Sequence, residues 1–87
     1  MVELIDSTST EISEPMEMLS LSLNERVHVR LRHNRVLTGR LVAYDDHLNL
    51  MLGDTQETIK TEATTVVKDH SIIFVRGDLV VAVSPIN

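Results

Sequence analysis

The chain has 87 residues, no cysteine and a formal net charge of −5 at pH 7. The length indicates one small domain near the margin of stability, and the lack of cysteine excludes disulfides and thiolate zinc sites as its support. We therefore expect partner subunits to supply the missing stability. The negative charge argues against a protein that coats phosphate backbones indiscriminately, but it permits one that reads bases at a confined site.

Residues 1–14 are acidic and rich in serine and threonine, which predicts a disordered tail ahead of a domain at residues 15–87. Positions 1–17 carry five acidic residues and no lysine or arginine, so the rest of the chain is neutral. No stretch approaches the roughly 20 apolar residues that span a bilayer, and no secretory signal is evident. We expect an intracellular protein that does not enter a membrane.

The first predicted element is a short helix. Pro15 fits its first position, where the missing N–H is no loss. Met16, Leu19 and Leu23 follow at spacings of three and four, which gives an apolar stripe. A helix of about two turns does not persist alone in water, so we expect it to pack on the rest of the domain.

From Arg26 the hydrophobic period changes to two. Valine and leucine alternate with arginine and histidine over residues 26–32, which predicts a half-buried strand. Residues 33–35 form a turn and residues 36–44 a second strand. Gly39, inside that strand, predicts a sharp bend of the kind found where a barrel curls.

Three further strands are expected after a second turn. The third is apolar on alternate positions, the fourth is long and rich in β-branched residues, and the last is apolar throughout. The expected ranges are a turn at 45–47, a strand at 48–52 with a bend at 53–54 and an extension to 58, a polar link at 59–63, a strand at 64–75 interrupted near 69–70, a turn at 76–78 and a strand at 79–83.

These elements predict an all-β domain, in which a short helix precedes five antiparallel strands that close into a small barrel. The last two strands are apolar on both faces, as at residues 72–75 and 79–83. Exposed edges of this kind would aggregate in a lone domain. Pairing with neighbouring copies or paralogues removes that hazard, and a head-to-tail contact closes into a ring when the rotation permits.

Two blocks of the sequence resemble the two motifs of the Sm and Sm-like (LSm) family. The first is LTGRLVAYDDHLNLMLGD at residues 37–54, and the second is IIFVRGDLVVAV at residues 72–83. The likeness covers residues 15–84. It implies an N-terminal helix on a strongly bent five-stranded antiparallel sheet, an SH3-like small barrel, with the fourth strand of one subunit paired to the fifth strand of the next. It also implies binding of uridine-rich single-stranded RNA, one nucleotide per subunit, in the ring lumen.

Within the family, residues 21–27, 39–49 and 52–58 are most similar to the third-subunit type of the eukaryotic LSm heptamers. The link between the third and fourth strands is shorter here than is usual in that type. The resemblance implies membership of two kinds of hetero-oligomeric ring, one on a spliceosomal small nuclear RNA and one on messenger RNA during decay. It therefore implies a place in both the nucleus and the cytoplasm.

Two turns far apart in the sequence carry side chains suited to a single base, and a bent barrel can bring them to one rim. His47 offers a flat ring for stacking, and Arg76 offers a guanidinium plane for the other side of the base. Asn49 supplies a donor and an acceptor for the uracil edge, and Asp45 is placed to orient it. Gly77 lets the backbone approach closely and has an N–H to donate. In the resembling family these positions match the stacking residue, the base-reading asparagine, its supporting aspartate and the Arg-Gly of the second motif, although many Sm subunits have Phe or Tyr where this chain has histidine.

Two other binding functions fit five short strands: an isolated OB-like fold for single-stranded nucleic acid, and a small barrel that only binds peptides. An OB fold normally places a helix between the third and fourth strands, and residues 54–65 are a poor helix. Domains that bind peptides in a groove need aromatic surfaces, and the chain has one tyrosine (Tyr44), one phenylalanine (Phe74) and no tryptophan. Residues 45–47 (Asp-Asp-His) could suggest a metal-dependent hydrolase, but no second cluster of carboxylates lies nearby in the sequence. No serine-nucleophile motif occurs either. We expect no enzyme, no metal, no cofactor and no small-molecule substrate.

Overall fold

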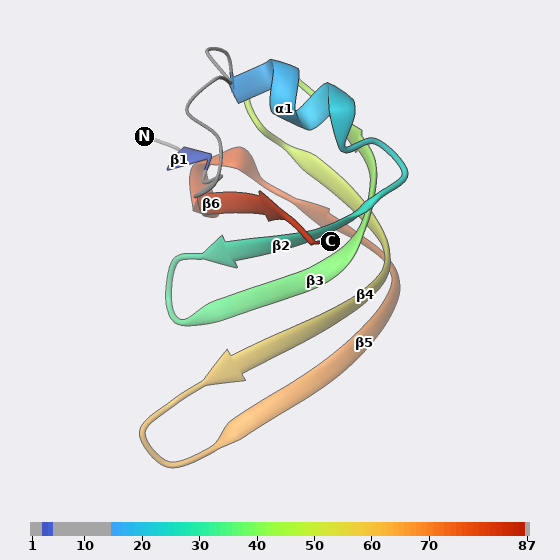
Figure 1. Cartoon of the computed structure of the whole chain (residues 1–87). Helices are drawn as coiled ribbons and strands as arrows, with labels where there is room; N and C mark the ends of the chain where they lie inside the picture. The colour runs from blue at the N-terminus through green and yellow to red at the C-terminus, as the bar shows by residue number, and fades with distance from the viewer. Residues whose placement is uncertain (1–2, 5–14, 87) are drawn as a thin grey trace.

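The computed structural model describes residues 3–4 and 15–86. Its elements follow the predicted order of one short helix and five strands, with one additional strand near the N-terminus (Figure 1). The all-β architecture is confirmed. The elements are β1 (Glu3–Leu4), α1 (Pro15–Leu21), β2 (Arg26–Leu31), β3 (Arg35–Tyr44), β4 (Leu50–Lys60), β5 (Thr65–Val75), a 3-10 turn (Gly77–Leu79) and β6 (Val80–Pro85).

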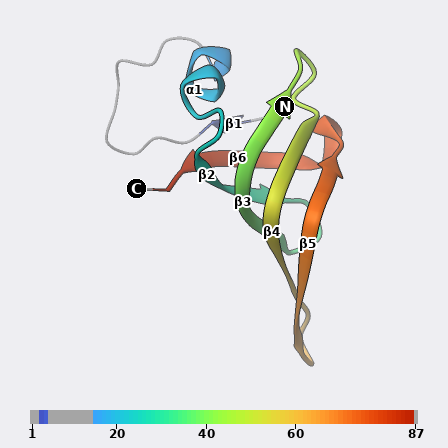
Figure 2. The ribbon, with the colours of Figure 1, turned by 90° about the vertical axis from the view of Figure 1, so that its right-hand side faces the viewer.

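The described strands form one sheet in the order β1-β6-β2-β3-β4-β5. The strand pairs β6–β2, β2–β3, β3–β4 and β4–β5 are antiparallel, as predicted. Figure 2 shows how strongly the sheet curls, because β6 runs across the direction of β3 and β4 instead of alongside them. The strand order leaves β5 as the outer strand on one side of the sheet.

β1 is an element that the sequence pattern did not predict. It pairs in parallel with β6, with Glu3 opposite Ala82 and Leu4 opposite Val83, inside the segment predicted to be a disordered tail. Residues 1–2 and 5–14 of that segment lie outside the described residues, so a disordered tail there stays a prediction.

The core lies inside the curled sheet and is closed by α1, which covers one end of it (Figure 1). Met18 and Leu19 of α1 are buried. Leu23, expected in the apolar stripe of the helix, is instead 39% exposed, because α1 ends at Leu21. The described part of the chain holds no helix with the length and apolarity to cross a membrane. The largest fully buried side chains are Leu19, Val27, Val29, Leu37, Leu41, Leu50, Leu52 and Val83.

The bend predicted at Gly39 is present. The pairing register between β3 and β4 shifts between Thr38 and Arg40, and a Cβ on Gly39 would overlap the side chain of Thr55 and lie 3.1 Å from the carbonyl oxygen of Gly53. The two strands therefore approach here more closely than any side chain at position 39 allows.

The strand after the turn at 45–47 differs from its predicted range. It starts at Leu50, because Leu48 takes a positive φ of 62° that interrupts extended backbone. It continues through a bend at Asp54, where φ is 48°, to the end of β4. The link to β5 is accordingly short, at residues 61–64. The predicted interruption near residues 69–70 is wrong, because both residues pair with β4.

Beyond the apolar core, β4 carries a buried carboxylate, Glu57, which is 4% exposed. Arg35 on β3 donates to Glu57 Oε2 through Nε at 2.8 Å and also through Nη2. On β5, His70 Nε2 lies 2.9 Å from Glu57 Oε1. Burial raises the pKa of the Glu57 carboxyl, but the hydrogen bonds from His70 and Arg35 and the charge on Arg35 outweigh it, so the net pKa is lowered.

Replacing Glu57 with glutamine is expected to lower the free energy of unfolding at pH 7 by about 1–3 kcal/mol, because the three hydrogen bonds to a charged acceptor are weakened or lost. The folded-state pKa of Glu57 lies below its ordinary value of 4.5, so its contribution is present above pH 4.5 and is lost as the pH falls through the folded-state pKa. Denaturant unfolding at pH 7 and pH 3 measures both effects. An equal gap between wild type and variant at the two pH values contradicts the assignment, and Glu62→Gln, at an exposed position in the link, is the matched control.

Candidate nucleic-acid interface

The turn between β3 and β4 is shaped by the carboxylate of Asp45. Its Oδ1 accepts the backbone N–H of His47 at 2.8 Å and that of Asn49 at 3.0 Å. The backbone N–H of Leu48 also donates to the carbonyl oxygen of Asp45 at 3.0 Å. Aspartate commonly closes turns by bonding to backbone groups a few residues ahead. One side chain thus fixes the conformation of residues 45–49.

The same carboxylate orients the side chain of Asn49, as predicted. Asn49 Nδ2 donates to Asp45 Oδ2 at 2.8 Å. This hydrogen bond is the largest cause of a lowered pKa at Asp45, followed by the two backbone N–H groups and the charge of His47, against the opposing effect of desolvation. Asp45 is therefore an acceptor-only group that stays ionised to a lower pH than an ordinary aspartate, and it holds the amide nitrogen of Asn49 on its own side.

The other end of the Asn49 amide is held by the distant turn after β5. Its Oδ1 accepts the backbone N–H of Gly77 at 2.7 Å, so two segments 28 residues apart in sequence meet here. Asn49 retains one N–H and one acceptor lone pair for a ligand. The Gly77 N–H, predicted to be a donor, donates within the protein to Asn49.

Gly77 is required by the close approach of the two turns. A Cβ at this position would overlap the carbonyl oxygen of His47 and lie 2.9 Å from the carbonyl carbon of Leu48. These are backbone atoms of a turn already fixed by Asp45, so they cannot move aside cheaply. Glycine is therefore the residue type that lets this rim form.

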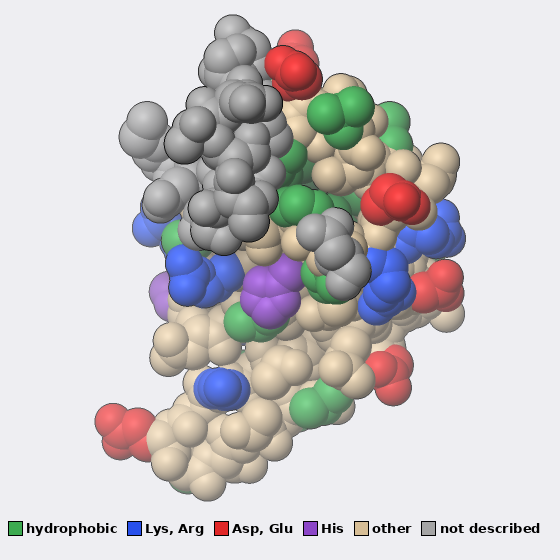
Figure 3. Space-filling view, viewed as in Figure 1, with side chains coloured by type: hydrophobic (Ala, Val, Ile, Leu, Met, Phe, Trp, Pro, Cys, Tyr) green, Lys and Arg blue, Asp and Glu red, His purple; other side chains and the backbone are tan. Residues whose placement is uncertain are grey.

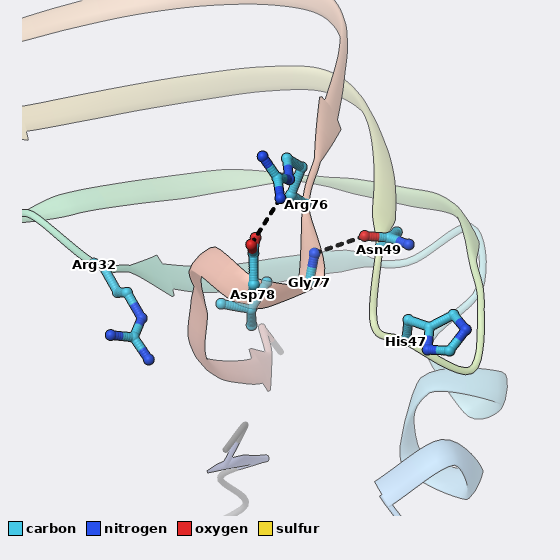
Figure 4. A pocket seen from close by; sticks show the side chains of 7 residues that line it. Arg32, His47, Asn49, Arg76, Gly77 and Asp78 are labelled. Atoms are coloured by element: carbon cyan, nitrogen blue, oxygen red, sulfur yellow. Dashed lines mark hydrogen bonds and ion pairs between the residues drawn. The ribbon is translucent and has the colours of Figure 1, made fainter.

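A pocket of about 330 Å³ opens beside this junction. Figure 4 shows the Asn49–Gly77 hydrogen bond in its middle, with Arg76 on one side and the ring of His47 on the other. Arg76 Nη2 donates to Asp78 Oδ2 at 2.8 Å, and its side chain is 72% exposed. The lining residues are Arg32, His47, Asn49, Arg76, Gly77, Asp78 and Val80.

The structure thus brings the predicted site residues to one rim, with different degrees of contact. Asp45, Asn49 and Gly77 are joined by hydrogen bonds. The guanidinium of Arg76 and the ring of His47 line the same pocket but point to different sides of it (Figure 4), so they are not stacked on each other. Their role in binding a base stays a prediction.

Arg32 and Asp78 line the pocket but were not singled out from the sequence. Arg32 follows β2 and its backbone N–H donates to the carbonyl oxygen of Leu79 at 3.0 Å, which places it beside the turn after β5. Only the pairing of β2 with β6 brings it there. The alternation of arginine along residues 26–32 was the available signal, and it indicated an exposed strand face rather than a pocket.

The chemistry of this rim suits recognition more than catalysis. It offers two exposed basic side chains, an imidazole and an amide of fixed orientation around an open pocket. Within residues 3–4 and 15–86, no three His, Asp or Glu side chains gather in an arrangement that could hold a metal ion. A flat group with both donors and acceptors at its edge, such as a nucleobase, matches these features.

Comparison with known proteins finds a family model, described as the LSM domain, that matches residues 17–85. The LSM complex subunit lsm3 of Schizosaccharomyces pombe is 42% identical over 84 residues, which cover 85% of this chain and 90% of the relative. The "Probable U6 snRNA-associated Sm-like protein LSm3" of Dictyostelium discoideum is 43% identical over an alignment of 88 positions that covers 85% of this chain and 87% of the relative.

Solved structures show the same fold. The Sm protein of Pyrococcus abyssii, in complex with a uridine heptamer, matches with a TM-score of 0.74 and 35% identity, over 85% of this chain and 100% of that chain. A heptameric archaeal Sm protein matches with a TM-score of 0.71 and 32% identity, over 82% of this chain and 98% of that chain.

Proposed function

The chain belongs to the LSM-domain family, and from that premise we propose that it is an RNA-binding subunit of a hetero-oligomeric ring of Sm-like subunits. The likeness to the third-subunit type is confirmed by the two LSm3 relatives. We place the ring-forming domain at residues 15–87, preceded by the acidic segment 1–14. The observation that carries the proposal is Asn49, held between Asp45 and Gly77 at the rim of an open pocket.

The ring is supported by the edges of the sheet. β5 is the outer strand on its side, and its side chains Ile72 and Phe74 are 60% and 63% exposed. An apolar edge of this length is an aggregation hazard unless another strand covers it. We propose that β5 of one subunit pairs with β6 of the next, which closes a ring. The heptameric archaeal Sm structure supports seven members.

The ligand is proposed to be uridine-rich single-stranded RNA. The ionised Asp45 must face the donor end of the Asn49 amide, and the Gly77 N–H must face its acceptor end, so this amide cannot flip. Its remaining N–H and lone pair complement the adjacent carbonyl and N–H of uracil. Cytosine presents its donor and acceptor at those positions in the opposite order, so a base in the same pose is rejected. The uridine heptamer bound by the archaeal Sm protein supports this choice.

Arg76 and His47 are proposed to cover the two faces of the base. They lie on different sides of the Asn49–Gly77 junction (Figure 4), and both line the same open pocket, which a flat ligand would enter between them. To stack on a base, Arg76 must first break its ion pair with Asp78. This costs little free energy, because both side chains are exposed and exposed ion pairs are weak. Each stacking contact contributes about 1–3 kcal/mol, too little for useful affinity from one pocket after the loss of association entropy.

In the cell, we propose that such rings act in pre-mRNA splicing, bound to a small nuclear RNA, and in messenger RNA decay. The relative described as U6 snRNA-associated supports the first role. We accordingly expect the protein in both nucleus and cytoplasm, and we assign it no catalytic step. The OB-like alternative is not supported, because only residues 61–64 join β4 to β5 and no helix fits there.

Replacing both Asn49 and Arg76 with alanine in an intact ring is expected to weaken oligouridine binding by about 10- to 100-fold, because one edge contact and one stack are removed. Fluorescence titration measures the affinity, and native mass spectrometry confirms the ring. Arg40→Ala is the matched control, since this arginine is 41% exposed but lies outside the pocket. Unchanged affinity in the double variant would remove the proposed site.

A further inference from the structure

The outer edge of β6 already has an occupant in the structure. β6 pairs with β2 on one side and with β1 on the other. β1 is parallel to β6, with Glu3 opposite Ala82 and Leu4 opposite Val83. In Figure 1 this short strand lies directly beside β6. The backbone groups on the outer edge of β6 near Ala82 and Val83 therefore face the N-terminal segment of the same chain.

This is the same edge that ring closure needs. β5, at the opposite side of the sheet, has no further strand in the described sheet and exposes Ile72 and Phe74. Head-to-tail closure must join that β5 to the outer edge of β6 in a neighbour. One strand edge pairs with one partner strand at a time, so β1 and the neighbour's β5 cannot both occupy it.

The charge distribution favours the chain's own N-terminal segment at the outer edge of β6. Residues 1–17 carry five acidic side chains and no basic ones. Glu3 is opposite Ala82 of β6, and Ala82 is opposite Arg30 of β2. Figure 3 shows basic and histidine side chains as a band across this face of the molecule. The exposed basic residues that β2 contributes are Arg26, His28 and Arg30.

We propose that the N-terminal segment caps the β6 edge of the free subunit and leaves it when a neighbouring subunit brings in its β5. The proposal rests on the ring described above and adds a step to its assembly. A tethered segment competes at a millimolar effective concentration, yet a two-residue strand offers only one or two hydrogen bonds. The cap therefore protects a free subunit against unspecific edge pairing and yields to the long apolar β5 of a true neighbour.

A reversible lock tests this directly, because the chain has no cysteine of its own. In the double variant Glu3→Cys with Ala82→Cys, the two residues are register partners in adjacent strands, within the reach of a disulfide. We expect an intrachain disulfide to form in the isolated full-length chain on mild oxidation. The oxidised chain should fail to enter a ring with the other subunits, and reduction should restore its entry. Glu3→Cys alone, treated identically, is the control.

Two results would overturn the cap: no intrachain disulfide in the isolated chain, or a disulfide-locked chain that enters the ring as well as the reduced one. Failure of the proposed ring is a separate result, because then the wild-type chain itself does not assemble. The disulfide in the isolated chain still reports on the cap in that case.

A second variant removes the cap without cysteine. Glu3→Pro with Leu4→Pro eliminates both β1 backbone donors, whereas Glu3→Ala with Leu4→Ala keeps them. We expect the proline variant to self-associate with an association constant about 5- to 20-fold above that of the alanine variant, since each lost hydrogen bond is worth roughly fivefold. Sedimentation velocity over a concentration series measures this, and equal self-association of the two variants would contradict the cap.

Discussion

Replacing Ile72 and Phe74 with lysine is expected to exclude the chain from its ring and to lower its oligouridine affinity by about two orders of magnitude or more, the range gained when weak sites are linked. Both side chains are more than half exposed on β5, the outer strand. Lysine on an edge strand blocks pairing with another strand. Added positive charge would by itself favour RNA binding, so a loss of affinity reports the loss of the ring.

Native mass spectrometry of the co-expressed subunits measures incorporation, and fluorescence titration measures affinity. The matched control places the same two substitutions at Leu21 and Leu23, which are 71% and 39% exposed at the end of α1 and just after it. The control is expected to enter the ring normally. Normal incorporation of the β5 variant would show that this edge is not the ring contact.

The Gly77→Ala variant is expected to lose about 2–4 kcal/mol of unfolding free energy and to bind oligouridine at least tenfold more weakly. An added Cβ overlaps the carbonyl oxygen of His47, and that turn is pinned by Asp45. The two turns must separate, and the Gly77 N–H then loses Asn49 as its acceptor. Both the fold and the pocket depend on this one junction.

Gly53→Ala is the matched control for this substitution. A Cβ on Gly53 lies 2.9 Å from Arg40 Nη2 and 3.3 Å from Val42 Cγ2, which are the ends of side chains that can move. The control is expected to change the unfolding free energy by less than about 1 kcal/mol. Denaturant unfolding of the two variants measures the difference, and an equal loss of stability would contradict the role given to the Gly77 junction.

The order of the elements along the chain follows from local patterns in the sequence. The period-two alternation that begins at Arg26 and the turn residues between strands were enough to place β2 to β6. Gly39 revealed its bend because glycine inside a strand indicates a close approach of backbone. The start of β4 was misplaced, because the positive φ at Leu48 is set by the Asp45 turn and has no signature in the hydrophobic pattern. The end of α1 was misplaced as well, because Leu23 continues the apolar spacing but lies beyond the last helical residue, Leu21.

The candidate site was partly accessible to the same reasoning. The resemblance to the two Sm motifs identified Asn49 and its support by Asp45, because residue types alone fit a solvent-facing strand residue at position 49 equally well. The use of the Gly77 N–H by Asn49, and the arrival of Arg32 at the rim, depend on strand pairing across the sheet. β1 was missed for a similar reason, because two residues of a polar segment carry no periodicity of their own.

The account depends most on the claim that one base pocket per subunit becomes useful only when a ring aligns several of them. The most direct measurement is a titration of fluorescent oligouridine against the intact ring and against the wild-type chain verified as a monomer by sedimentation. We expect submicromolar binding by the ring and no saturable binding by the monomer at micromolar concentrations. Submicromolar binding by the verified monomer would contradict the account.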